Sequence, residues 1–221
     1  MKVGFLLPVF RWTPDDALAA AELGAQSGVD GVFAYDHLWP MGSPERPALS
    51  PFPVLASVSV RCPSLIVGPL VARVGITSDA HLIEAFRSLE LAAPGRVIAA
   101  IGTGDKLSAS ENEAYGIAMQ PVAERQAMVE HIASALSDSM PVWIGAGAPA
   151  TNAIAARVGA TLNYWQKTPE SSTGPWNWAG NPRDDLEAQL DELAAGGSTW
   201  AIFSPNVDVP RLGRWRRTRG E

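Results

Sequence analysis

The sequence is poor in the residues that form disulfides and metal centres. Cys62 is the only cysteine among 221 residues, so neither an internal disulfide nor a cysteine-based zinc site can form. The three histidines, His37, His81 and His131, are dispersed, which predicts no metal centre. His81 and His131 fall in expected helices and are interpreted as structural. A single cysteine is typical of the reducing cytoplasm, where we expect this protein.

Long apolar runs and an excess of positive charge are also missing. The apolar start of the chain, interrupted by Pro8, is too short for a signal peptide or a membrane span, so we expect no membrane partner. The net charge of −6 argues against nucleic-acid binding. Five basic residues nevertheless lie in 211–221, interpreted as a basic C-terminal tail. This tail is either a solvated terminus or a clamp for phosphate or carboxylate groups.

Common catalytic motifs are absent as well. The sequence contains no G-x-x-x-x-G-K-[ST] loop, no G-x-S-x-G elbow and no H-E-x-x-H pair. These absences argue against a P-loop nucleotide site, a serine hydrolase of the α/β type and a zinc peptidase.

Helix and strand signals alternate along the whole chain. The hydrophobic fraction of 47% supplies a large core. Expected strands are Val3–Val9, Gly31–Asp36, Ser64–Val71, Arg96–Ile101, Pro141–Gly145, Thr161–Trp165 and Thr199–Ser204. Helix starts are expected at Thr13, Ser78 and Asn181, and glycines end helices at Gly28, Gly95, Gly159 and Gly197.

This alternation predicts a parallel sheet covered by helices, either a closed (β/α) barrel of the TIM type or an open doubly wound sheet. Only seven strands are recognisable where a barrel has eight, and 166–180 has loop composition. We therefore predict a pruned barrel, with a single domain over 1–210. Exposed apolar strand edges in such a barrel favour a homodimer.

An acid–imidazole pair, Asp36 and His37, follows the second expected strand. Functional residues gather at the carboxyl ends of parallel strands, where such a pair can orient a substrate and move a proton near neutral pH. We predict these two as catalytic residues. The alternative is a hydrogen-bonded loop pair without catalytic function.

Two glycine-containing turns follow later strands. Gly102, Thr103 and Gly104 come after an apolar run, where glycine lets a backbone approach a flat ring or a phosphate; a tight turn is the alternative. The second turn, 145–152, leads into a helix whose free N–H groups favour phosphate. It also fits the loose dinucleotide fingerprint. Pro149 removes one donor, however, and the required acid about 20 residues further on is missing.

The order of four stretches is characteristic. They are Val3–Pro8, Gly31–Trp39, Ala93–Asp105 followed by Glu111–Gly116, and Pro141–Gly147. Together they resemble luciferase-like oxidoreductases over residues 1–165, most closely the branch that uses the deazaflavin coenzyme F-420. Glu113 and Tyr115 match a helix-loop signature of that family. The family's acid-glycine-tryptophan after strand six appears here as Leu162–Trp165, a departure from the pattern.

The resemblance implies a flavin or deazaflavin ring at the carboxyl-terminal mouth of the barrel, near Asp36 and His37. Gly68-Pro69 matches the position where such enzymes often carry an unusual peptide bond behind the ring, and proline makes a cis bond less costly. The other implied cofactor ligands are Gly102, Thr103 and Gly104 at the ring or ribityl chain, and Gly145, Ala146, Gly147, Thr151 and Asn152 at the phosphate.

The implied function is an oxidoreductase that transfers a hydride between F-420 and a small organic substrate, with His37 as proton donor or orienting group. One alternative is an FMN-dependent monooxygenase. Another is a non-catalytic flavin-binding protein with a reduced barrel.

Overall fold

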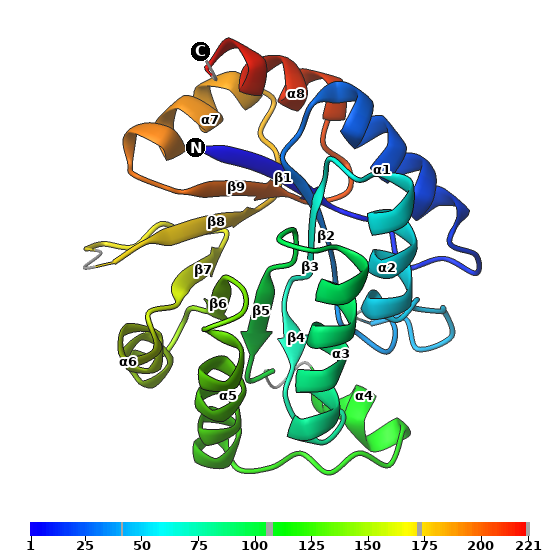
Figure 1. Ribbon diagram of the computed structural model, residues 1–221, viewed down its shortest axis with the longest axis vertical. Helices are drawn as coiled ribbons and strands as arrows, with labels where there is room; N and C mark the ends of the chain where they lie inside the picture. The colour runs from blue at the N-terminus through cyan, green and yellow to red at the C-terminus, as the bar shows by residue number, and fades with distance from the viewer. Residues whose placement is uncertain (41, 105–107, 172–173, 220–221) are drawn as a thin grey trace.

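The computed structural model describes residues 1–40, 42–104, 108–171 and 174–219, in which helices surround a ring of strands (Figure 1). The strands are β1 (Lys2–Leu6), β2 (Gly31–Ala34), β3 (Ile66–Pro69), β4 (Ala72–Arg73), β5 (Ala99–Gly102), β6 (Val142–Gly145), β7 (Thr161–Trp165), β8 (Trp176–Gly180) and β9 (Trp200–Phe203). The helices are α1 (Asp15–Ser27), α2 (Pro51–Arg61), α3 (Asp79–Ala92), α4 (Ala109–Ala114), α5 (Val122–Leu136), α6 (Pro149–Val158), α7 (Leu186–Ala195) and α8 (Val209–Thr218). No helix in these ranges is long and apolar enough to cross a membrane.

The strands form the predicted (β/α) barrel. Their order is β3-β2-β1-β9-β8-β7-β6-β5-β4, with parallel pairing throughout. The two ends of this order, β3 and β4, are successive pieces of one strand, interrupted at the cis peptide bond between Leu70 and Val71. Because Val67 also bridges Val97 beside β5, the ring is nearly closed. The argument for a homodimer from exposed strand edges therefore loses its basis.

The eighth barrel position is filled by β8, which the sequence analysis missed because it lies within 166–180. Trp176 and Trp178 belong to the core between strands and helices, whereas Ala179 belongs to the barrel interior. What the barrel lacks is a helix between β7 and β8, since the described residues of 166–175 form none (Figure 1). Among the described residues the barrel is thus short of a helix and not of a strand, and two buried indoles lie in this part of the wall.

Gly28, Gly159 and Gly197 end helices as predicted, whereas α3 ends at Ala92 and Gly95 lies in the turn after it; the predicted starts are confirmed only in part. φ is 80°, 71°, 67° and 85° at Gly28, Gly95, Gly159 and Gly197, the left-handed region that glycine adopts freely. Ser78 caps α3 by accepting from the His81 backbone N–H. The start at Thr13 was wrong, because its hydroxyl donates to Asp15 and α1 begins at Asp15. The start at Asn181 was wrong as well, because Gln189 binds the backbone of Asn181 and Arg183 and holds them in a loop before α7.

Inward-facing side chains divide the barrel into a filled layer and a hollow layer. Phe33, Trp143 and Trp200 pack together in the filled layer, with ring centroids 5.3 to 5.6 Å apart. Since side chains alternate along a strand, the next inward positions toward the carboxyl ends of β5 and β6 are Gly102 and Gly145. The missing side chains at these two positions leave the upper layer open.

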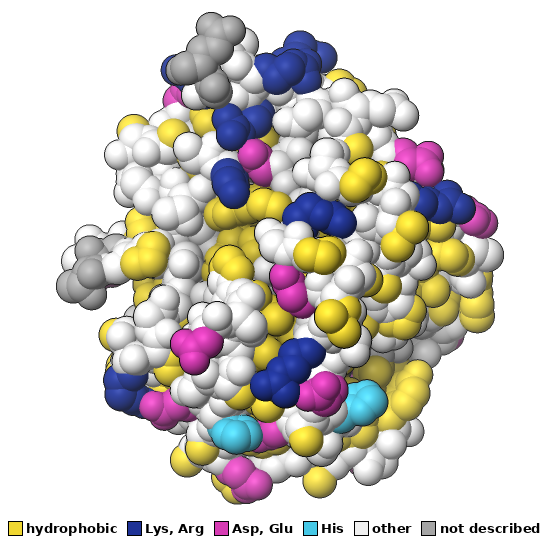
Figure 2. All heavy atoms as spheres, in the orientation of Figure 1, with side chains coloured by type: hydrophobic (Ala, Val, Ile, Leu, Met, Phe, Trp, Pro, Cys, Tyr) yellow, Lys and Arg dark blue, Asp and Glu magenta, His cyan; other side chains and the backbone are white. Residues whose placement is uncertain are grey.

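The expected basic tail is instead a packed helix. Residues 211–218 belong to α8, which lies against α1, while 220 and 221 fall outside the described residues. Arg216 pairs with Asp30 at 2.7 Å, and Arg219 pairs with Asp191 at 2.6 Å. Figure 2 accordingly shows basic and acidic side chains side by side over the end of the molecule formed by α7 and α8. These arginines are engaged in surface ion pairs, which argues against the alternative of a ligand clamp.

Gly213 tests the contact between α8 and α1. A Cβ at this position would lie 2.0 Å from the Ser27 carbonyl oxygen. Alanine normally stabilises a helix over glycine by about 1 kcal/mol, but this clash with backbone outweighs that preference. We expect Gly213→Ala to lower the free energy of unfolding by about 1–3 kcal/mol in urea denaturation. The control is Gly174→Ala, whose Cβ would meet nothing within 4 Å; equal stability of both variants would contradict the close packing of α8.

Candidate active site

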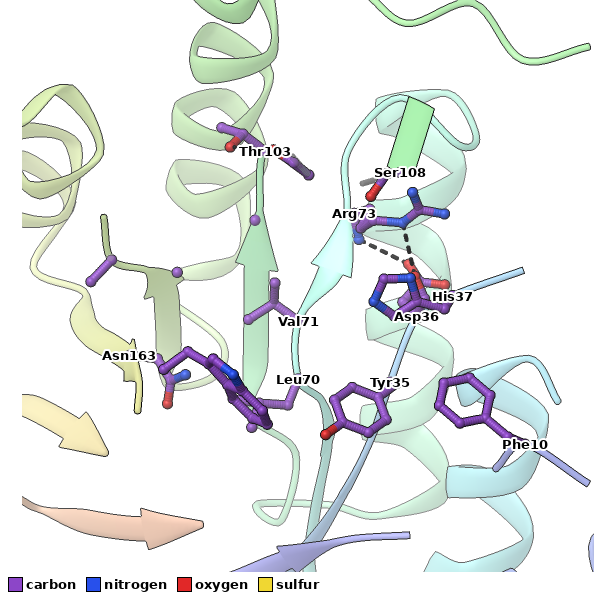
Figure 3. A pocket seen from close by; sticks show the side chains of 15 residues that line it. Phe10, Tyr35, Asp36, His37, Leu70, Val71, Arg73, Thr103, Ser108 and Asn163 are labelled. Carbon is purple, nitrogen blue, oxygen red and sulfur yellow. Dashed lines mark hydrogen bonds between the residues drawn. The ribbon is translucent and has the colours of Figure 1, made fainter. Parts of the chain in front are cut away.

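A cavity of about 530 Å³ lies at the carboxyl ends of the strands, beside the open layer (Figure 3). This volume is within the range of about 300–1,000 Å³ typical of small-molecule sites. Seven of the predicted site residues line it, namely Asp36, His37, Gly102, Thr103, Gly104, Gly145 and Ala146. Further lining residues, not predicted as site residues, are Phe10, Tyr35, Leu70, Val71, Arg73, Ser108, Asn163 and Trp165.

A buried carboxylate, Glu111, organises one wall of the cavity. Its Oε1 lies 2.7 Å from His37 Nδ1, and its Oε2 accepts hydrogen bonds from the Leu38 backbone N–H and the Arg73 guanidinium, both at 2.9 Å. The side chain of Glu111 is fully buried, and that of Arg73 is 6% exposed. A buried ion pair keeps its charges only when further hydrogen bonds complete it, as they do here. This network connects α4 to the loop after β2 and to β4.

The network determines which nitrogen of His37 faces the cavity. Because carboxylate oxygens only accept hydrogen bonds, the contact with Glu111 assigns a proton to Nδ1. In the neutral ring Nε2 then carries a lone pair. The ring points into the cavity, in the direction of Val71 (Figure 3). His37 can therefore accept a proton from a bound molecule, or donate one when it is charged.

Asp36 has a different environment from its neighbour. Its Oδ2 accepts the Arg73 backbone N–H at 2.8 Å, and its own carbonyl oxygen accepts from Arg73 Nε at 2.8 Å (Figure 3). Burial raises the pKa of the Asp36 carboxyl, and the Arg73 N–H and guanidinium oppose this rise. Asp36 thus anchors the start of the chain segment that carries His37. These contacts are those expected of the alternative interpretation, in which Asp36 belongs to a hydrogen-bonded loop.

The cavity floor consists of positions without bulk. A Cβ on Gly102 would lie 2.4 Å from Val71 Cγ2, and a Cβ on Gly145 would lie 3.9 Å from the same atom. A flat ring can approach the backbone here because both side chains are absent. Beside the floor, Asn163 Oδ1 is buried without a hydrogen-bond partner among the described residues. Such an acceptor costs about 1–3 kcal/mol, which a ligand N–H or O–H group would offset.

Arg125 holds the turn that supplies Thr103 and Gly104 to the lining. Its guanidinium donates to the carbonyl oxygens of both residues, and its Nε donates to the Gln120 carbonyl oxygen at 3.0 Å. The backbone of this turn is therefore fixed from outside the cavity. Asp105 lies outside the described residues.

Several predicted ligands do not line the cavity. The cis bond expected at Gly68-Pro69 lies instead between Leu70 and Val71, and these two residues are the ones that reach the cavity. Gly68 is pressed against the neighbouring strand, since a Cβ there would lie 2.5 Å from the Ile98 carbonyl oxygen. The remaining three are Gly147, Thr151 and Asn152. The Thr151 hydroxyl caps the start of α6 by accepting the Ala148 backbone N–H at 3.4 Å, and it donates to the Ala148 carbonyl oxygen at 2.8 Å.

Glu111 and Arg73 were missed although the sequence carried one signal for them. Glu111 opens a stretch that resembles the family. The residues of this stretch that match the helix-loop signature, Glu113 and Tyr115, are exposed and do not belong to the site. Arg73 stands in no recognisable motif, and only the course of the chain after Val71 brings it beside Asp36.

Comparisons with known proteins agree with this architecture. The model of the luciferase-like monooxygenase family matches residues 1–137. The chain is 25% identical over 187 residues to an F-420-dependent glucose-6-phosphate dehydrogenase of Nakamurella multipartita. The matched region covers 72% of this chain and 54% of that protein. The chain is 32% identical over 112 residues to an F-420-dependent hydroxymycolic acid dehydrogenase of Mycobacterium tuberculosis, which covers 48% of this chain and 30% of that protein. The chain thus spans about half the length of the first relative and less of the second.

Solved structures show the same fold. An F-420-dependent secondary alcohol dehydrogenase in complex with an F-420–acetone adduct superposes with a TM-score of 0.78 at 12% identity, over 97% of both chains. A monooxygenase from Streptomyces bottropensis superposes with a TM-score of 0.77 at 13% identity, also over 97% of both chains. At such identities the likeness concerns the fold alone.

The Glu111 carboxylate can be tested by removing its charge. Glu111→Gln leaves the Arg73 guanidinium buried without its counter-ion, and breaking a buried pair costs about 3–5 kcal/mol. We expect the free energy of unfolding to fall by about that amount in urea denaturation. Glu113→Gln, exposed on the same helix, is the control and should change stability by less than about 0.5 kcal/mol. Similar stability of the two variants would contradict a buried network around Glu111.

Tyr35 offers a second test, because burial raises the pKa of its phenol to about 12. In the unfolded chain this phenol ionises near pH 10, so stability due to Tyr35 is present below about pH 10 and is lost as the pH rises to about 12. We expect the ultraviolet titration of ionised tyrosine to contain a component with a midpoint of about 12. Tyr35→Phe should remove this component and Tyr115→Phe should leave it; the reverse result would refute the assignment.

Proposed function

We propose that this chain, which belongs to the luciferase-like monooxygenase family, is an oxidoreductase that transfers a hydride between coenzyme F-420 and a small organic substrate. The observation that carries the proposal is the His37 imidazole, which Glu111 holds at the wall of a cavity with a glycine floor. A proton-transfer group beside a site for a flat ring is what such a reaction requires.

The residues present fit a flavin or deazaflavin ring. Gly102 and Gly145 would lie under the ring, Val71 beside it, and Asn163 would offer its unpaired amide oxygen to a ring donor. When bound, a deazaflavin supplies an acceptor or donor for one hydride. Binding of the cofactor phosphate by the segment from Gly147 to Asn152 stays a prediction. The Thr151 hydroxyl is engaged with the Ala148 backbone, so it is less available to a phosphate.

His37 would carry the proton of the reaction. When an alcohol is oxidised, its O–H proton passes to Nε2 as the carbon–hydrogen bond gives up a hydride, and the alcohol becomes a carbonyl compound. The Glu111 carboxylate 2.7 Å from Nδ1 stabilises the resulting imidazolium. In the reverse direction the same nitrogen returns the proton to the oxygen.

FMN is the alternative cofactor. Support for F-420 comes from the two relatives compared above, both of which are dehydrogenases named as F-420-dependent. An FMN-dependent monooxygenase is the second candidate, because the matching family model describes monooxygenases and a solved monooxygenase shares the fold. A non-catalytic flavin-binding protein is the third candidate, and the feature that favours it is the lack of a helix in the described residues between β7 and β8.

A homodimer and a reducing compartment stay predictions of the sequence analysis, and exposed strand edges no longer support the homodimer. Cys62 is a free, buried thiol, in keeping with a reducing compartment. A monomeric mass in light scattering at micromolar concentration would count against the homodimer.

Titration of the protein with F-420 and with FMN, followed by cofactor fluorescence, tests the proposed function. We expect tight binding of F-420 and reduction of the bound cofactor by a secondary alcohol. His37→Ala should change the affinity for F-420 less than about 3-fold but lower turnover by about 100-fold or more, since general acid–base catalysis contributes roughly that much. His81→Ala, exposed on α3, is the control. Preference for FMN would favour the monooxygenase, and binding of neither cofactor would refute both.

A further inference from the structure

The cavity has an aromatic wall centred on Tyr35. Phe10 stacks on Tyr35 with centroids 5.6 Å apart and planes at 8°, and Trp165 meets the Tyr35 ring edge-on at 6.1 Å. The wall joins the loop after β1, the end of β2 and the end of β7. All three rings line the cavity, so a bound molecule on this side meets mainly apolar surface.

The Tyr35 hydroxyl is a polar group in this otherwise aromatic wall, beside the indole N–H of Trp165. In Figure 3 it points away from Phe10 and across the cavity. It makes no hydrogen bond with the residues that the structure describes. Because the pKa of the phenol is raised to about 12, the hydroxyl keeps its proton and offers a neutral donor at any physiological pH.

The charged groups of the described lining are already engaged. The Arg73 guanidinium donates to Glu111 and to the Asp36 carbonyl oxygen, and the Asp36 carboxyl accepts the Arg73 N–H. Arg11 and Arg46 reach Phe10 only through its carbonyl oxygen, and Arg11 is paired with Asp16. A phosphate or carboxylate in the cavity would therefore lose its hydration without gaining a free guanidinium or ammonium partner from the described lining.

We propose that Tyr35 donates a hydrogen bond to the oxygen of the substrate, and that the wall of Phe10, Tyr35 and Trp165 selects an uncharged, largely apolar alcohol or carbonyl compound. This inference rests on the proposed oxidoreductase function and specifies its substrate class. It sets the chain apart from its relative named for a phosphorylated sugar. His37 and Tyr35 would meet the same oxygen, the first to transfer its proton and the second to orient it.

Calorimetry on F-420-loaded protein tests the substrate class with three cyclohexane-based probes and with glucose 6-phosphate. Cyclohexanone is uncharged and carries the oxygen, cyclohexyl phosphate adds charge to the same ring, and methylenecyclohexane replaces the oxygen by CH2. We expect cyclohexanone to bind at least about 10-fold more tightly than cyclohexyl phosphate or glucose 6-phosphate. Tighter binding of either phosphate would overturn the inference while leaving the cofactor-dependent function intact.

The role of Tyr35 is tested by Tyr35→Phe, which keeps the ring and removes the hydroxyl. We expect cyclohexanone to bind about 2- to 10-fold more weakly, the loss of one neutral hydrogen bond, with the affinities for methylenecyclohexane and F-420 unchanged. Tyr115→Phe, at an exposed position, should alter none of the three affinities. Equal weakening of cyclohexanone and methylenecyclohexane would show a packing role and overturn the assignment of the donor. Failure of wild-type protein to bind F-420 would refute the proposed function itself, and this inference with it.

Discussion

The buried carboxylate of Glu111 is the group on which the candidate site depends. It binds the His37 ring, the Leu38 N–H and the Arg73 guanidinium at once, and so joins α4 to the ends of two barrel strands. In an interior of low polarity, a polar or charged group without a partner costs free energy. The three groups and Glu111 therefore hold one another in position. The orientation of His37 is therefore set by a residue 74 positions away in the chain.

A second constraint is how bulk is distributed inside the barrel. Phe33, Trp143 and Trp200 fill one layer, and the inward positions above it, at Gly102 and Gly145, are empty of side chains. The filled lower layer lies beneath a cavity that is already formed in this structure. On each strand, every second residue faces the barrel interior. One such residue packs in the filled layer and the next one toward the carboxyl end borders the cavity, so the same strands serve both stability and binding.

The described residues between β7 and β8 form no helix, and this affects the outer side of the barrel more than the carboxyl ends of the strands. β7 and β8 remain paired in register, and Asn163 and Trp165 on β7 still face the cavity. Trp176 and Trp178 are buried although the described residues between these strands form no helix, which explains part of the tryptophan content. A barrel wall without this covering helix in its described residues is therefore compatible with a nearly closed ring of strands.

The sequence by itself determined the features that depend on neighbouring residues. Alternating apolar runs, glycine helix ends such as Gly28 and the Asp36–His37 pair at a strand end could all be read within a few positions. The five-residue strand β8 escaped because its neighbours have loop composition, and the basic stretch from Arg211 was misjudged because its ion-pair partners lie elsewhere in the chain. The tertiary structure alone decided which predicted residues meet in the cavity. It brought in Glu111, because a contact between distant segments leaves no periodic trace in a sequence.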